Sequence, residues 1–233
     1  MKMFSGDNFF TRLMNRAGIL IAANLLFVLC CLPVFTAGAG LAALYYTLLR
    51  ALREKWELNP FETFWTGLKE NFRQGTLAGL ALLLLAAALT LEVFWCGQLG
   101  GAALLFRYGL YALAVLSAAA AAYLFPVMAA FRCTLLQLMR NSMAFALRQP
   151  AVTLAALLLN VVPMACTFLL DAYLPLFAFL WCTVGFGGGA LLCAKLFLPQ
   201  FRPYLPAVED LEGEAPVQKS ERQTLREMRR LGL

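Results

Sequence analysis

Five long stretches of this 233-residue chain contain no Asp, Glu, Lys or Arg. A helix needs about 20 apolar residues to cross about 30 Å of hydrocarbon, because it rises about 1.5 Å per residue. Each stretch is long enough for at least one such crossing, so the sequence predicts an all-α fold, a polytopic transmembrane helix bundle. The stretches are residues 17–49, 74–91, 108–131, 149–170 and 172–194.

Composition supports this fold class. The chain is 62% hydrophobic and 14% charged, and its mean hydropathy is +0.74, outside the range of ordinary soluble domains. A formal net charge of +6 would also suit a nucleic-acid partner, but the basic residues lie in short segments between apolar stretches. That pattern is typical of orientation signals and of contact with anionic lipid. We therefore expect the lipid bilayer as a partner, and no nucleic acid.

The chain changes character after its last apolar stretch, which suggests two regions. Residues 1–198 are predicted to form the transmembrane helical domain. Residues 199–233 are predicted to form a cytoplasmic tail, because three prolines and an acidic run there are typical of a linker. Beyond this linker, the spacing of leucine, methionine and arginine predicts a short basic amphipathic helix.

The first stretch is long enough to contain two helices. Pro33 lacks a backbone donor and clashes with the preceding turn, and Gly38 and Gly40 loosen the backbone just beyond it. The sequence therefore predicts helices over about 13–32 and 38–55, which gives six spans. The alternative is one long kinked helix, which gives five spans and places the N-terminus on the opposite face.

The distribution of basic residues favours six spans. With a hairpin and a tight outer turn from Pro33 to Gly38, both termini are cytoplasmic, and Arg107 is the only one of the 19 Lys and Arg residues left outside. The single-helix alternative moves three further basic residues out. We therefore expect a multi-pass protein of the cell membrane with both termini inside.

Two inner segments are predicted to form amphipathic helices. Asn59, Pro60 and Glu62 are typical of a helix start. An aromatic stripe follows them, and two roles remain open for it, burial in the headgroup plane or packing against the bundle. The second segment, 132–148, contains no acidic residue and carries Leu135, Met139 and Met143 on one face. The stripe consists of Phe61, Phe64, Trp65, Leu68 and Phe72.

The residue inventory argues against an enzyme. The chain has no His, so the commonest general base and all imidazole metal ligands are missing. Its seven Cys lack the spacing of a zinc site and lie in or beside apolar stretches. The glycine-rich run 185–189 lies within a span, where small residues favour close helix packing over phosphate binding. Gly75 and Gly79 are expected to allow the same close approach of another helix. No cofactor or metal is expected.

Polar residues near the spans provide the remaining candidates. Glu92 and Asp171 lie at the outer ends of spans, and Glu92 is expected either to pair with Arg107 or to face a substrate. Asn24 and Asn160 are the polar residues deepest in spans. Each is expected to form hydrogen bonds between helices rather than to contact a substrate.

Several short motifs stand out in this sequence, namely Asn24-Leu25-Leu26, Leu32-Pro33, Thr36, Gly38, Ala43-Leu44-Tyr45, Phe64, Lys69, Asn71-Phe72, Gln74, Phe125-Pro126, Phe131 and Asn141. Together they resemble the YesL family of bacterial membrane proteins, which is defined by the domain of unknown function 624. The resemblance extends over about residues 8–200 and is strongest in the first third. This chain has Ala39 where the family often has a proline.

The resemblance implies a modest function. Members of this family are uncharacterised components found beside carbohydrate importers and polysaccharide-degrading enzymes in Gram-positive bacteria. We therefore expect an accessory protein for carbohydrate uptake without catalytic chemistry, with ABC-transporter subunits, another membrane protein or a second copy as partner. The alternative is a small-solute transporter in its own right. The candidate functional or structural residues are Asn24, Pro33, Thr36, Gly38, Tyr45, Glu92, Pro126, Asn141 and Asp171.

Overall fold

A computed structural model describes residues 9–98, 104–131 and 133–204, and over these residues the fold is helical without strands. Six helices or helix combinations are long and apolar enough to cross a membrane, as predicted. The tail beyond residue 204, with its predicted amphipathic helix, lies outside the described residues. The helices are α1 (Phe9–Cys31), α2 (Ala37–Arg53), α3 (Pro60–Gln98), α4 (Leu104–Ala130), α5 (Leu135–Arg148), α6 (Pro150–Leu169), α7 (Leu174–Leu180) and α8 (Phe186–Phe201), and shorter helical turns are η1 (Val34–Thr36), η3 (Asp171–Tyr173), η4 (Trp181–Gly185) and η5 (Arg202–Tyr204).

The first apolar stretch forms two helices, so the single kinked helix is excluded. The α1 helix ends at Cys31, and Pro33 precedes the short turn η1 that leads into α2. The Thr36 hydroxyl donates hydrogen bonds to the carbonyls of Cys30 and Pro33. The end of a helix leaves its last carbonyls without a helical donor, and this hydroxyl supplies one to the Cys30 carbonyl, while the Pro33 carbonyl also accepts from the Thr36 N–H at 2.9 Å.

The third helix is longer than the sequence analysis anticipated. The amphipathic segment that begins at Pro60 continues without a break into the predicted span, so that α3 extends to Gln98. Its start is capped as predicted, because the Phe61 N–H donates to the Asn59 side-chain oxygen at 3.1 Å. At about 1.5 Å per residue α3 is roughly 58 Å long, well beyond the thickness of the hydrocarbon core.

The predicted aromatic stripe on α3 is divided between two environments. Phe64 and Leu68 are buried in the bundle, as the packing alternative expects. Trp65 is 56% exposed, Phe61 and Phe72 are also exposed, and the Lys69 ammonium lies 5.6 Å from the centre of the Trp65 ring. Around the helix axis, Phe64 lies about a quarter of a turn away from Phe61, Trp65 and Phe72. The stripe therefore does not form a single face.

Glycines allow α2 and α3 to approach closely. A Cβ added to Gly38 would lie 2.3 Å from the Gly75 carbonyl oxygen and 2.8 Å from the Gly79 Cα. Farther along the same pair, a Cβ on Gly67 would meet the Tyr46 side chain. Because each partner atom at Gly38 belongs to the backbone, no side-chain rotation could relieve the clash. The close approach that small residues permit in membrane bundles therefore occurs here, as expected for Gly75 and Gly79.

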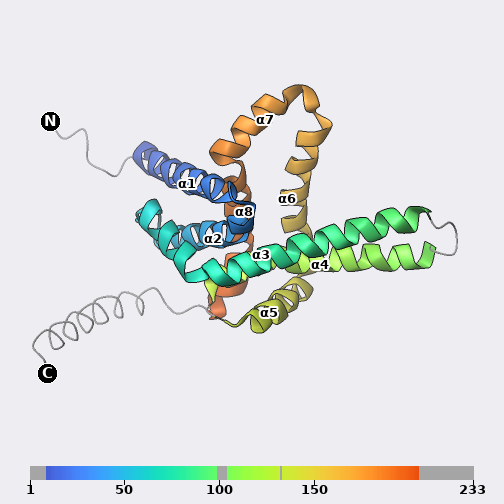
Figure 1. Ribbon diagram of the computed structural model, residues 1–233. Coiled ribbons are helices and arrows are strands. Elements are labelled where there is room, and N and C mark those ends of the chain that lie inside the picture. Colours follow the sequence, from blue (N-terminus) through green and yellow to red (C-terminus); the bar gives the residue numbers. More distant parts are fainter. Residues whose placement is uncertain (1–8, 99–103, 132, 205–233) are drawn as a thin grey trace, which may run out of the picture.

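This contact offsets the α1–α2 pair from the α3–α4 pair along the axis of α3. Gly38 lies against the middle of α3, and the helix continues from Gly79 to Gln98 for roughly 28 Å. In Figure 1 the far halves of α3 and α4 accordingly extend together beyond the α1–α2 pair. The turn at Pro33 is tight, as predicted, but it does not lie level with the end of α3 at Gln98 or the start of α4 at Leu104. With α3 along the membrane normal, the turn at Pro33 and the α3 end at Gln98 cannot both lie at the outer surface.

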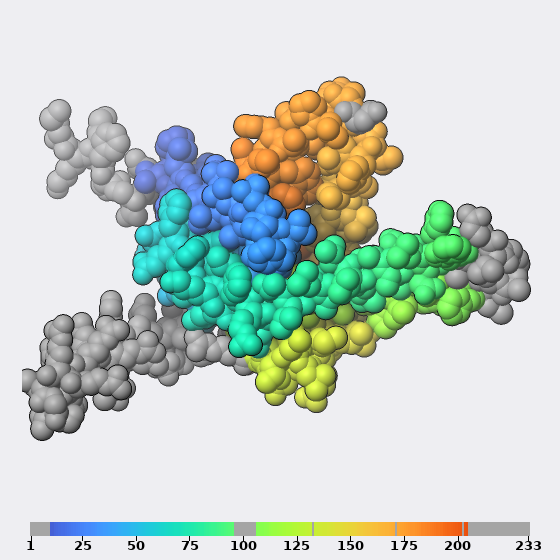
Figure 2. All heavy atoms as spheres, viewed as in Figure 1, coloured from blue at the N-terminus to red at the C-terminus, as the bar shows by residue number. Residues whose placement is uncertain are grey.

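The core lies where α2, α4 and α8 meet. Leu44 and Leu48 of α2, Val127 of α4 and Phe197 of α8 are fully buried. In the space-filling view, the α3–α4 pair and the α6–α7 segment project from this centre in different directions (Figure 2). The α5 helix packs through Leu138, Ser142 and Ala146, so the predicted face with Leu135 and Met139 is directed outward.

We predict that Gly38→Ala destabilises the protein by at least about 1–3 kcal/mol, because an added methyl group meets packed backbone rather than a movable side chain. The matched control is Gly18→Ala in α1, where an added Cβ meets nothing within 4 Å. Thermal unfolding in detergent is the measurement. Equal melting temperatures for the two variants would contradict the close α2–α3 packing.

Candidate functional site

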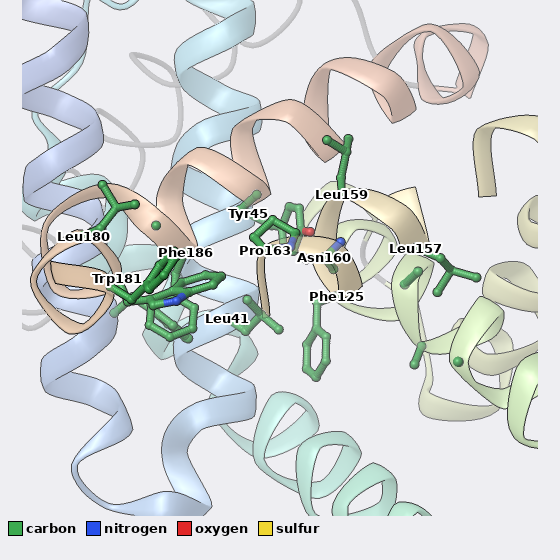
Figure 3. A pocket seen from close by; sticks show the side chains of 17 residues that line it. Leu41, Tyr45, Phe125, Leu157, Leu159, Asn160, Pro163, Leu180, Trp181 and Phe186 are labelled. Carbon is green, nitrogen blue, oxygen red and sulfur yellow. The ribbon is translucent and has the colours of Figure 1, made fainter. Parts of the chain in front are cut away.

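A cavity of about 510 Å³ lies among α1, α2, α4, α6, α7 and α8, and we call it the membrane cavity. Its described lining is mainly apolar and aromatic and contains no acidic or basic side chain. In Figure 3, Trp181 and Phe186 lie together on one side of the cavity, while Asn160 and Pro163 lie near Tyr45. The centres of the Trp181 and Phe186 rings are 4.8 Å apart. This lining suits an apolar or aromatic occupant.

Regular helical hydrogen bonding is interrupted on several sides of this cavity. Pro163 lies inside α6 and cannot donate to the carbonyl of Leu159, and both residues line the cavity. Pro126, a predicted site residue, is buried inside α4 next to the lining residue Phe125. On the opposite side, Trp181–Gly185 forms a π-helical turn between α7 and α8. Such turns often occur at functional sites, and prolines bend helices.

Asn24 binds the π-helical turn. Its side chain is fully buried, and its amide nitrogen donates to the Trp181 carbonyl at 3.1 Å and to the Cys182 carbonyl at 2.7 Å. Its side-chain oxygen accepts a hydrogen bond from the Gly187 N–H at 2.7 Å. A π-helical turn shifts the helical hydrogen-bonding pattern, and one asparagine supplies partners on both sides of the shift. Asn24 therefore forms hydrogen bonds between segments, as predicted.

Gly187 makes this contact possible. A Cβ added to Gly187 would lie 3.2 Å from the Asn24 Cβ and 3.2 Å from the Leu20 side chain. The glycine-rich run thus provides close packing against α1, in agreement with the predicted packing role. The indole N–H of Trp181 donates to the Thr167 hydroxyl at 2.9 Å and so connects the π-helical turn to α6.

Asn160 and Tyr45 are the polar side chains in the described cavity lining, apart from the Trp181 indole. The Asn160 amide donates within its own helix to the Ala156 carbonyl at 2.7 Å and across to the Cys193 sulfur at 3.3 Å. Tyr45 is 6% exposed and is buried beside Cys193. Asn160 thus connects α6 to α8, as expected, and it also lines the cavity.

An aromatic cluster joins α4, α5 and α8 next to this cavity. The Tyr123 ring centre lies 4.3 Å from that of Phe197, and Phe145 stacks on Tyr123 at 6.4 Å. Phe201 lies against Phe145 at 5.2 Å. Tyr123, Phe197 and Phe201 are fully buried. A solute that left the cavity along this route would have to separate tightly packed rings.

Beyond this cluster is a second cavity, of about 460 Å³, at the junction of α4, α5 and η5. Asn141, a predicted site residue, lines it together with Gln137, Arg148 and Tyr204. The two cavities share no lining residue among those described. The sequence indicated Asn141 but not its grouping with Arg148 and Tyr204, because the approach of Tyr204 to α5 depends on the fold of α8.

The remaining predicted site residues do not converge on either cavity. Glu92 is exposed on α3, and it forms no ion pair with Arg107 in the described structure. The Arg107 guanidinium instead lies 5.7 Å from the centre of the Tyr111 ring. The expected Glu92–Arg107 pair is therefore absent, because Arg107 is directed toward its own helix. Asp171 begins η3, and its side chain lies outside the description.

Comparison with known proteins identifies a family over part of the chain. Residues 20–93 match the model of a family described as "Protein of unknown function, DUF624". The match covers about a third of the chain and confirms the predicted resemblance over the second half of α1, all of α2 and most of α3. No curated protein and no solved structure matches the chain significantly.

We predict that Asn24→Leu lowers the free energy of unfolding by about 2 kcal/mol or more, because it leaves two carbonyls and one N–H without their partner. The control is Asn160→Leu, which loses one bond within its own helix and one weak bond to sulfur. Chemical denaturation of both variants in detergent micelles provides the comparison. A larger loss of unfolding free energy in Asn160→Leu than in Asn24→Leu would contradict the stabilising role of the Asn24 hydrogen bonds.

Proposed function

We propose that this multi-pass membrane protein acts as an accessory component of carbohydrate uptake and performs no chemistry itself. The observation that carries the proposal is the internal use of the deepest polar side chains: Asn24 and Asn160 bind other parts of the chain. Thr153 in α6 likewise donates to the Ala146 carbonyl at 2.8 Å. A sugar needs several convergent polar partners, and the apolar membrane cavity offers few.

Unpartnered apolar faces support an assembly role. On the far half of α3, Leu84, Leu91 and Phe94 are largely exposed, and Val115 on α4 is exposed as well. Lipid chains or helices of another membrane protein would cover these faces. The resemblance to proteins encoded beside carbohydrate importers favours ABC-transporter subunits as the partner, and a second copy of the chain is the other option.

A small-solute transporter remains the second candidate, and one observation favours it. The membrane cavity lies beside a π-helical turn and a proline-containing helix, an arrangement that resembles the discontinuous helices at transporter binding sites. Against it stands the aromatic cluster around Tyr123, which separates this cavity from the second one.

Copurification distinguishes the two functions. We expect the tagged protein, solubilised gently from its host membrane, to retain ABC-transporter subunits, and the purified protein alone in vesicles to take up no carbohydrate. A similarly expressed, unrelated tagged membrane protein controls for nonspecific retention. Carbohydrate uptake by the purified protein without any retained subunit would overturn the accessory role in favour of transport.

We also propose a topology, with both termini cytoplasmic and the α1–α2 hairpin entering the membrane without crossing it. The charge distribution, with Arg107 as the only outer basic residue, supports the position of the termini. The turn itself suits hydrocarbon, because Leu32 is 77% and Val34 69% exposed. The Thr36 hydroxyl donates to the Cys30 and Pro33 carbonyls of this turn. Non-helical backbone at membrane depth requires such internal hydrogen-bond partners.

Cysteine labelling in a cysteine-free background tests this topology. With a membrane-impermeant maleimide on intact cells, we expect Gly109→Cys near the α3–α4 connection to react. Ser5→Cys should react only in inverted vesicles, and Phe35→Cys only after solubilisation. Labelling of position 35 from outside would show that the α1–α2 turn crosses the membrane, and labelling of position 5 from outside would exclude a cytoplasmic N-terminus.

A further inference from the structure

We propose that the second cavity, at the junction of α4, α5 and η5, binds a phosphate group, whether carried by a soluble sugar phosphate or by an anionic lipid. The cavity measures about 460 Å³, which is enough for a ligand of this size. It shares no described residue with the membrane cavity, and its role is independent of the proposed accessory function.

The polar lining consists mainly of hydrogen-bond donors. The Arg148 guanidinium donates to the Tyr204 hydroxyl oxygen at 3.0 Å, which leaves the hydroxyl proton free to donate in turn. The Gln137 side-chain oxygen accepts from the Thr134 N–H at 3.1 Å, and its NH₂ group supplies two donors for a ligand. The Asn141 amide contributes two further donors. Phosphate oxygens are acceptors and match this set.

The described lining of this cavity carries no negative charge that would compete with an anion. None of its described lining residues is acidic, and no acidic residue occurs in the sequence between Arg132 and Leu170. Burial raises the pKa of the Cys133 thiol, so this lining residue stays protonated and neutral around pH 7. Among the described residues no carboxylate pairs with Arg148, and the contact with Tyr204 holds its guanidinium at the cavity lining.

Aromatic walls define what a ligand carries besides phosphate. Phe131, Phe145 and Tyr204 line the cavity, and the ring centres of Phe145 and Tyr204 are 6.0 Å apart. Sugar rings pack their C–H faces against aromatic side chains, and the first carbons of an acyl glycerol do so as well. The shared requirement is thus a phosphate joined to a compact body that is apolar on one side.

Binding measurements separate the two sources of phosphate. The full chain in nanodiscs of phosphatidylcholine is titrated with glucose 6-phosphate by calorimetry, with glucose as the uncharged control. In parallel, native mass spectrometry measures retention of phosphatidylglycerol against phosphatidylcholine. We expect binding in at least one arm, and the arm that responds identifies the source. Absence of binding in both arms would overturn the proposal.

Matched arginine variants test the site itself. Arg148→Gln is expected to weaken binding at least about tenfold, because it removes a charge-assisted hydrogen bond. Arg140→Gln on the same helix removes an equal charge from an exposed position outside the described cavity lining, and is expected to change affinity less than about twofold. Asn141→Ala, which keeps the charge, should also weaken binding. Equal losses at Arg140 and Arg148, with none at Asn141, would show a general charge effect and contradict the site.

Discussion

The backbone contact between α2 and α3 sets the arrangement of the other elements. Gly38 fits against Gly75 and Gly79 so closely that a single methyl group would collide with main-chain atoms. This contact fixes where α2 lies along α3, and α2 in turn provides fully buried residues such as Leu44 and Leu48 to the core. The stagger between the two hairpins and the exposed apolar tip at Val34 both follow from the same contact.

Polar groups inside the bundle serve its architecture. Thr36 completes the end of α1, and Asn24 supplies the partners that a π-helical turn needs. In hydrocarbon an unsatisfied backbone group is costly, so such residues stabilise irregular segments that would otherwise straighten or unfold. Asn160, the amide that lines the membrane cavity, is likewise bonded within the protein, to the Ala156 carbonyl and the Cys193 sulfur, so this cavity retains little polarity. The polar cavity around Arg148 is a different environment, where donors converge without a carboxylate.

The sequence predicted features that depend on local chemistry. Pro33 marked the end of α1, Asn59 the start of α3, and the spacing of Gly75 and Gly79 a close helix contact, because each effect acts within a few residues. The hydrogen bonds of Asn24 and Asn160 to other segments were also predicted, since a deep amide in a span needs a partner.

Features that depend on the relative placement of helices were not predicted. Trp65 is exposed while Phe64 is buried, because α2 covers only one side of α3. The π-helical turn at Trp181 had no recognisable signal apart from the glycines that follow it. The approach of Tyr204 to Arg148 joins residues far apart in the sequence.

The stagger between the hairpins is the claim on which the membrane placement depends most directly. Pulsed electron paramagnetic resonance can measure it between spin labels at Phe35 and Phe94, both exposed, in a cysteine-free protein in nanodiscs. With Gly38 against Gly79, Phe94 lies roughly 23 Å farther along α3. The step from Gly38 back to Phe35 shortens this offset, so we expect a separation of roughly 20 Å. A distance below about 15 Å would place the two turns at the same level and contradict the account.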